Sequence, residues 1–169
     1  NIEMHRCTCP IFIRLGNRNR AAEVTAESAN AVEYGGKKAK GGAVPRAVFN
    51  HKSRIEAIRI EHVQAEEAEL PLILAGYRQG LRTKRLKNIT LKDIDITYAN
   101  RPERVDKRLF IPEYAKVYPE CWRFRNLPAY GIWARHVENL TLQNVCVKHP
   151  LPTWKKENIF KDCHDMIKK

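Results

Sequence analysis

Two aspartates, Asp93 and Asp95, have the spacing in this sequence that comes nearest to hydrolytic chemistry. On a strand they would share one face, about 6.5–7 Å apart by strand rise. An inverting glycosidase holds an acid and a base about 6.5–9.5 Å apart, so that a water molecule fits between them. However, Asp93 aligns with His62 and Asn144 in the repeat described below, where a polar bend residue is expected. We therefore interpret both aspartates as structural and predict no catalytic residue in this chain.

The cysteines are an odd and scattered set of five. Cys7 and Cys9 would share one face of a strand with His5, and Cys163 stands beside His164. This spacing matches no zinc-binding pattern, and a disulfide framework normally shows a dense, even number of cysteines. We interpret the cysteines as buried structural thiols, leave their disulfide status open, and predict no metal and no cofactor.

The net charge favours a polyanionic partner. In 169 residues, 31 Lys and Arg oppose 19 Asp and Glu, which gives +12. No apolar run approaches the roughly 18 residues of a transmembrane helix, so we predict no membrane partner. The basic residues are spread along the chain, and the cluster Lys37, Lys38 and Lys40 lacks the Gly-Lys-Ser/Thr ending of a phosphate-binding loop. The charge fits an acidic polysaccharide as well as it fits a nucleic acid. Because the basic residues form no single cluster, nucleic acid is the less favoured of the two partners.

Internal repeats indicate the elements that position these residues. The twelve-residue segments 54–65, 85–96 and 136–147 align without gaps, and their aliphatic residues alternate with polar ones. A period of two predicts strands with one buried face, joined by bends. Asn88 and Asn139 share the fourth position, where we expect a tight turn and pairing between stacked copies.

Further strands and insertions complete the predicted architecture. We expect a truncated copy with Asn1 at the position of Asn88, and a short last copy that begins at Asn158. Apolar segments at 10–16, 70–76 and 130–135 predict additional strands. Units that cannot bury their faces alone must stack, so we predict an all-β solenoid of parallel coils over residues 1–169, rather than the alternative antiparallel sandwich. Its loop insertions are 17–52, with a short helix over 21–32, and the aromatic-rich 98–127, which either flanks a binding groove or packs against the coils.

Two segments resemble a known family. Residues 10–18 (PIFIRLGNR) and 127–145 (LPAYGIWARHVENLTLQNV) resemble stretches common in bacterial members of glycoside hydrolase family 28, the polygalacturonases and rhamnogalacturonases. The similarity extends over most of the chain apart from 17–52. It implies a right-handed parallel β-helix that acts on pectin, a polymer rich in galacturonate carboxylates.

The catalytic motifs of this family are absent from the sequence. The family's catalytic carboxylates belong to Asn-Thr-Asp and Asp-Asp motifs, assisted by Gly-His-Gly and Arg-Ile-Lys. None of these stands in this sequence, and Arg85-Leu86-Lys87 is only superficially like the last. We therefore expect a C-terminal part of a pectin-degrading hydrolase, with the catalytic residues on preceding coils and an extracellular or periplasmic location. The alternative is a non-catalytic carbohydrate-binding or structural β-helix module.

Basic and aromatic residues near the strand ends are the candidates for substrate binding. A planar guanidinium pairs with a carboxylate through two parallel hydrogen bonds, and aromatic rings stack on sugar faces. The candidate substrate-binding residues are Arg14, Arg18, Tyr130, Trp133, Arg135 and His136.

Overall fold

The computed structural model describes residues 1–16, 53–99, 110–115, 117–124 and 127–169, and they form an all-β structure. One short 3-10 helix, η1 (Cys121–Phe124), interrupts the strands. No helix in the described ranges is long and apolar enough to cross a membrane. The strands are β1 (Ile2–His5), β2 (Phe12–Arg14), β3 (Glu56–Ala68), β4 (Leu72–Ala75), β5 (Tyr77–Gln79), β6 (Arg82–Lys84), β7 (Leu86–Tyr98), β8 (Ala129–Lys148) and β9 (Lys156–Lys168).

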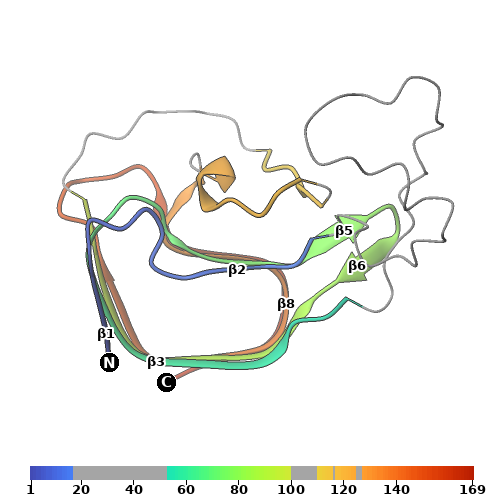
Figure 1. Ribbon diagram of the computed structural model, residues 1–169, viewed down its shortest axis with the longest axis horizontal. Helices are drawn as coiled ribbons and strands as arrows, with labels where there is room; N and C mark the ends of the chain where they lie inside the picture. The colour runs from blue at the N-terminus through green and yellow to red at the C-terminus, as the bar shows by residue number, and fades with distance from the viewer. Residues whose placement is uncertain (17–52, 100–109, 116, 125–126) are drawn as a thin grey trace, which may run out of the picture.

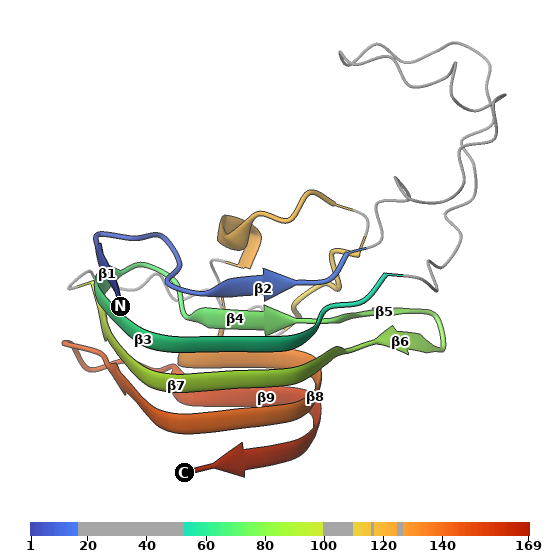
Figure 2. The same ribbon diagram turned by 60° about the horizontal axis from the view of Figure 1, so that its bottom comes forward.

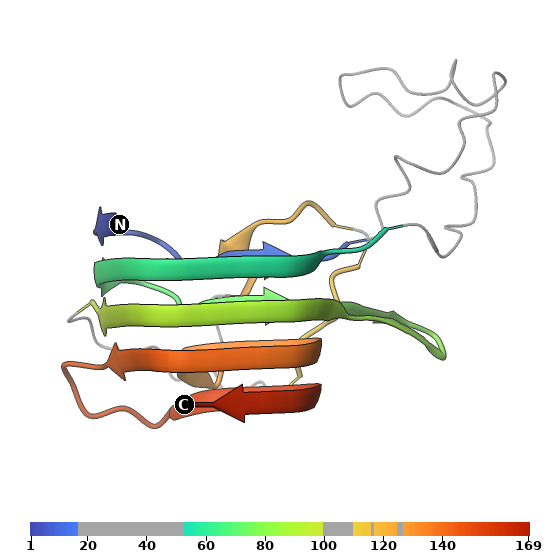
Figure 3. The same ribbon diagram turned by 90° about the horizontal axis from the view of Figure 1, so that it is seen from below.

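Seven of these strands form one parallel sheet with the order β1-β3-β7-β8-β4-β2, and β9 pairs with β8 (Figures 2 and 3). The exception is the hairpin β5–β6, a two-stranded antiparallel sheet beside it. Strands that are neighbours in the main sheet run in the same sense, so the antiparallel sandwich is wrong for the described residues.

The long strand β8 makes the sheet curl. Its residues 132–135 pair with β4, whereas residues 137–148 pair with β7. The sheet therefore turns back on itself, and two walls face each other (Figure 1). We call β3, β7 and residues 137–148 of β8 the open wall, and β2, β4 and residues 129–135 of β8 the covered wall.

The register of the open wall confirms the alignment of the three long repeats. Ile58 pairs with Ile89, and Ile89 pairs with Leu140. The side chain of Asn139 donates a hydrogen bond of 2.8 Å to the side-chain oxygen of Asn88. Both asparagines adopt left-handed backbone angles, with φ of 57° and 54°, which Asn tolerates better than most residues. The bend and the stacking predicted for this position are therefore present.

The register of the two terminal copies differs from the sequence-based expectation. Ile2 pairs with Val63, which places Asn1 beside His62 rather than at the position of Asn88. In the last copy, Asn158 lies beside Ile132, and Asp165 takes the left-handed position equivalent to Asn139. Each long strand has two or three left-handed bends, such as His136, Asn139 and Asn144 in β8, so a short fragment aligns with more than one of them.

Burial separates the two walls. On the open wall, buried aliphatics alternate with more exposed side chains, as they do along β7. All four residues of β4 are buried, and most residues of 129–137 are buried as well. The inner faces of both walls form the main core. A second core lies on the outer face of the covered wall, where residues 110–115 and 117–124, called the loop 110–124 below, pack over it (Figure 1). The insertion 17–52, with its expected helix, lies outside the described residues.

Candidate functional site

The two described arginines of the predicted substrate-binding set hold the loop 110–124 in place. Arg14 and Arg135 lie in one outward column of the covered wall, separated by the small Ala75. Their side chains are buried: Arg14 is 8% exposed and Arg135 is 4% exposed. Arg14 donates to the carbonyl oxygens of Tyr114 and of Tyr118, the latter at 3.2 Å. Buried cations bonded to backbone carbonyls act here as anchors for the loop.

Arg135 uses both terminal nitrogens in the same way. It donates to the carbonyl oxygens of Ile111 at 2.7 Å and Pro112 at 2.9 Å. Burial, together with the nearby charge of Arg135, lowers the pKa of Arg14 to about 10. Burial also lowers the pKa of Arg135, while Glu113 raises it. Both arginines remain cationic at neutral pH.

The aromatic candidates fall into two separate groups. Trp133 is 1% exposed and packs against Phe124 of η1, with ring centroids 5.5 Å apart. The guanidinium of Arg135 lies 4.8 Å from its ring centroid. Tyr130 lies instead with Tyr98, at a centroid distance of 6.2 Å. The sixth candidate, Arg18, lies outside the described residues.

His136 stands between two carboxylates at the edge of the covered wall. Its Nδ1 lies 2.6 Å from Asp162 Oδ2, and its Nε2 lies 3.2 Å from Glu113 Oε2. Asp162 also accepts a hydrogen bond of 2.6 Å from Arg85 and lies 2.9 Å from His164 Nε2. These contacts connect the loop with the beginning of β7.

The hydrogen bonds of this cluster keep both carboxylates ionised. Burial would raise the pKa of Glu113, but bonds from His136 and the backbone N–H of Arg78 lower it below its ordinary value. Burial opposes ionisation of Asp162 too, and its hydrogen bonds from His136, His164 and Arg85 again prevail, so its pKa is lowered. Neither group is therefore suited to donate a proton near neutral pH.

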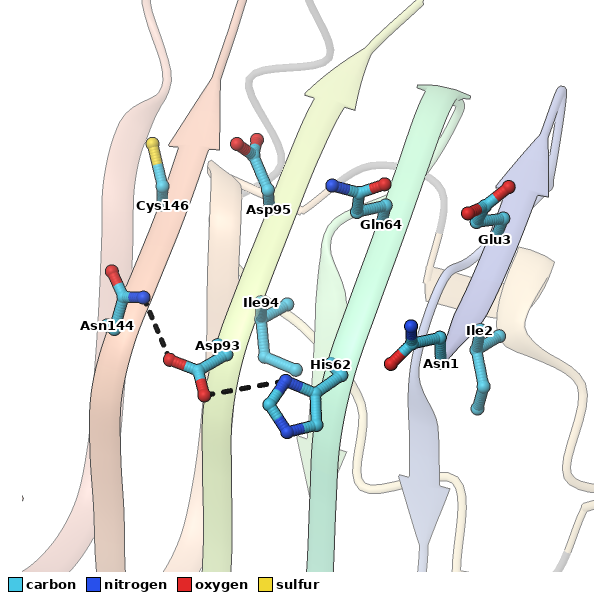
Figure 4. A pocket seen from close by; sticks show the side chains of 10 residues that line it. All are labelled: Asn1, Ile2, Glu3, His62, Gln64, Asp93, Ile94, Asp95, Asn144 and Cys146. Atoms are coloured by element: carbon cyan, nitrogen blue, oxygen red, sulfur yellow. Dashed lines mark hydrogen bonds and ion pairs between the residues drawn. The ribbon is translucent and has the colours of Figure 1, made fainter.

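A polar groove of about 360 Å³ crosses the bend of the open wall, where β1, β3, β7 and β8 lie side by side (Figure 4). Asp93 and Asp95 both line it. Asp93 accepts a hydrogen bond of 2.8 Å from Asn144 and lies 3.5 Å from His62 Nδ1, while Asp95 pairs with Lys148 at 3.3 Å. The hydrogen bond from Asn144 lowers the pKa of Asp93. An ionised Asp93 cannot supply the proton that glycoside hydrolysis needs.

A basic pocket of about 530 Å³ opens where β3 and β7 begin, beside the hairpin β5–β6. Among the described residues, five basic side chains and two carboxylates line it, a net charge of +3. Parallel pairing stacks the starts of the repeats, and the hairpin adds two cations from β6. The basic lining residues are Arg54, Arg82, Lys84, Arg85 and Lys87.

The two carboxylates of the basic pocket neutralise two of its cations. Glu138 accepts a hydrogen bond of 2.8 Å from Lys87, and Glu56 lies 3.3 Å from Arg54 Nε. Arg85 contacts Asp162, which joins the pocket to the cluster around His136. This pocket was not predicted from the sequence. The sequence feature that could have predicted the pocket is the basic residue at the start of two repeats, Arg54 and Arg85. Stacked copies bring such equivalent residues together.

Metal-binding chemistry finds no support in the described ranges, where no group of three His, Cys, Asp or Glu side chains could hold an ion. All five cysteines are described and all are free thiols. Cys146 is exposed and the others are half-buried, so the interpretation as buried thiols is wrong for Cys146. Burial raises the pKa of the Cys9 thiol, so this thiol stays protonated near neutral pH.

Comparison with known proteins adds no relative: no family model matches the sequence, and neither a curated protein nor a solved structure matches it. The resemblance to glycoside hydrolase family 28 therefore rests on the two segments quoted above. Function has to be argued from the geometry of the basic pocket and the polar groove.

Proposed function

We propose that this chain is part of a right-handed parallel β-helix that binds an acidic polysaccharide of the pectin class. The basic pocket is the observation that carries this proposal. It gathers five cations within one concave site on rungs of the sheet, and a galacturonan presents a carboxylate on each sugar. The curled sheet of in-register parallel strands supports the β-helix architecture.

Binding is better supported than bond cleavage. Hydrolysis needs a carboxyl whose pKa is raised so that it can act as an acid at working pH. In the described residues, each carboxyl group with a shifted pKa is shifted downwards: Glu61, Asp93, Glu113, Glu138 and Asp162. These observations favour the role of a carbohydrate-binding module.

A role within a pectin-degrading hydrolase is compatible with this module. The chain would then contribute substrate binding as the C-terminal coils of a polygalacturonase-like protein, and paired carboxylates on other coils would cleave the polymer. Because pectin lies outside cells, this function places the protein in an extracellular or periplasmic compartment.

The test is binding of polygalacturonate to the wild-type chain and to an Arg82→Glu/Lys84→Glu variant. Exposed ion pairs are each worth about 0.2–1 kcal/mol, so losing two of them should weaken binding about two- to thirtyfold, and repulsion by the two new carboxylates adds to this loss. Titration calorimetry measures the affinity at low and at high salt. Binding should weaken as salt rises, because the contacts are exposed to solvent.

The matched control is Lys156→Glu/Lys169→Glu, which makes the same change in net charge outside the basic pocket. It should retain most of the affinity. Equal weakening by both variants would show that net charge alone binds the polymer and would overturn the pocket assignment. Tighter binding of single-stranded DNA than of polygalacturonate would show that the ligand is a nucleic acid and not a polysaccharide.

A further inference from the structure

The loop 110–124 is held firmly yet presents aromatic rings to solvent. Its backbone carbonyls accept hydrogen bonds from the buried Arg14 and Arg135, and Phe124 is 1% exposed in the second core. Three other rings of the same loop are exposed: Phe110 at 80%, Tyr118 at 56% and Trp122 at 54%. An ordered aromatic surface that remains in water is typical of a binding site.

A cation stands beside one of these rings. The guanidinium carbon of Arg123 lies 5.9 Å from the ring centroid of Trp122, within the range of a cation–π contact. Arg123 is further oriented by Glu120, whose Oε2 lies 3.1 Å from its Nε. Trp122 and Arg123 both belong to η1, whose last residue, Phe124, is buried against Trp133. The ring and the charge therefore share one short element that is fixed to the covered wall.

This combination suits one class of sugar. The apolar face of a pyranose ring can lie on an indole, which offers a large flat apolar surface. A guanidinium next to that indole can pair with a carboxylate through two hydrogen bonds. A uronic acid carries both features, a pyranose face and a carboxylate, whereas a neutral sugar offers only the first.

We infer that Trp122 and Arg123 form a binding site for a uronic acid residue, distinct from the basic pocket. Trp122 stacks on the sugar ring, and Arg123 binds its carboxylate. This inference rests on the proposed function, because it assigns a second contact for the same acidic polymer. It extends the binding surface from the beginning of the open wall to the loop over the covered wall.

Tryptophan fluorescence tests the stacking directly. Titration of the full chain with trigalacturonate should quench the emission of Trp122, and Trp122→Phe should abolish most of that quenching. Trp154→Phe is the matched control, because Trp154 is also exposed, at 45%, and belongs to another loop. It should leave the quenching unchanged.

Affinity separates the roles of the two residues. Trp122→Ala should weaken binding of trigalacturonate about five- to tenfold, as expected for loss of an aromatic stacking partner. Arg123→Leu should weaken trigalacturonate similarly but leave the methyl-esterified trimer unaffected, because that trimer has no carboxylate. Thermal unfolding verifies that both variants fold. If Trp122→Ala does not fold, Trp122→Phe, which retains an aromatic ring, takes its place.

The outcomes distinguish this inference from the proposed function. If polygalacturonate binding depends on Arg82 and Lys84 but not on Trp122 or Arg123, the loop site is wrong and the proposed function stands. If the wild-type chain binds neither polygalacturonate nor its trimer, both are wrong. If Arg123→Leu weakens the methyl ester as much as the free acid, the site does not recognise a uronate carboxylate.

Discussion

The open wall and the covered wall share the strand β8, yet their outer faces differ. Along residues 137–148 of β8, the outward side chains are partly or fully exposed. Along residues 129–135 of the same strand, outward side chains such as Trp133 and Arg135 are buried beneath the loop. The inner faces of the two segments contribute to one aliphatic core.

This difference shows that alternation alone does not define a surface. Alternation of apolar and polar residues predicts which side chains point away from the core, and this prediction is correct for both walls. Whether those side chains meet water depends on a loop that is distant in sequence. For Arg14 the nearest partners are about a hundred residues away, at Tyr114 and Tyr118.

The largest effect is expected when the covered wall is broken at Trp133. Trp133→Ala removes the ring that packs against Phe124 and supports the guanidinium of Arg135. Large-to-small changes of a fully buried aromatic cost about 3–5 kcal/mol. Urea unfolding should show this loss of stability, and the loop 110–124 should become susceptible to proteolysis.

Two substitutions sharpen the comparison. Thr141→Ala changes an outward residue of the same strand on the open wall, and Trp154→Ala removes an exposed ring elsewhere. Each should alter the free energy of unfolding by no more than about 0.5 kcal/mol. A loss of several kcal/mol at Thr141 would show that the open wall is covered in solution as well.

Much of the curled sheet follows from the sequence. The self-alignment of 54–65, 85–96 and 136–147 predicted the register of the open wall residue by residue, because aliphatic columns and the bend at Asn88 recur together. The terminal copies were misplaced because a short fragment matches several of the left-handed bends equally well. The apolar segments 70–76 and 130–135 were predicted as strands, and they form β4 and part of β8.

The candidate site was less predictable than the sheet. Basic and aromatic residues near strand ends were chosen by type, but no local pattern states that a loop will bury Arg14, Trp133 and Arg135. The basic pocket depends on stacking Arg54 over Arg85 and on the fold of the hairpin β5–β6. Contacts between distant segments determine both the burial of these side chains and the shape of the basic pocket. Such contacts leave no repeat or motif in a single sequence.

Acid should loosen the covered wall before the open wall. The pKa values of Glu113 and Asp162 are lowered in the folded state, so the stability they contribute is complete above their ordinary values of 4.5 and 3.8. As pH falls through and below that range, protonation removes the contacts with His136 and releases the loop. In a variant with Trp122 and Trp154 replaced by Phe, the emission of Trp133 should shift to the red.

Circular dichroism in the far ultraviolet should still report an intact sheet at the pH where this shift begins. Asp162→Asn provides the comparison, because an amide cannot be protonated in this range, and the acid-induced shift should be smaller in that variant. An emission of Trp133 that is constant down to the global acid unfolding transition would mean that the two walls unfold as one unit.

A smaller loss than at Trp133 is expected at the bends of the open wall, where the side chains of Asn88 and Asn139 are exposed. Asn139→Ala forces a left-handed φ of 57° on a residue that disfavours it and removes an exposed hydrogen bond, a loss of about 1 kcal/mol. Asn139→Gly relieves the backbone strain and should lose less. Ala57 already occupies the equivalent bend with φ of 59°, so Ala57→Gly should stabilise the chain by up to about 1 kcal/mol. If both glycine variants destabilise equally in urea unfolding, side-chain stacking rather than backbone strain governs these corners, and the open wall depends on its outer face after all.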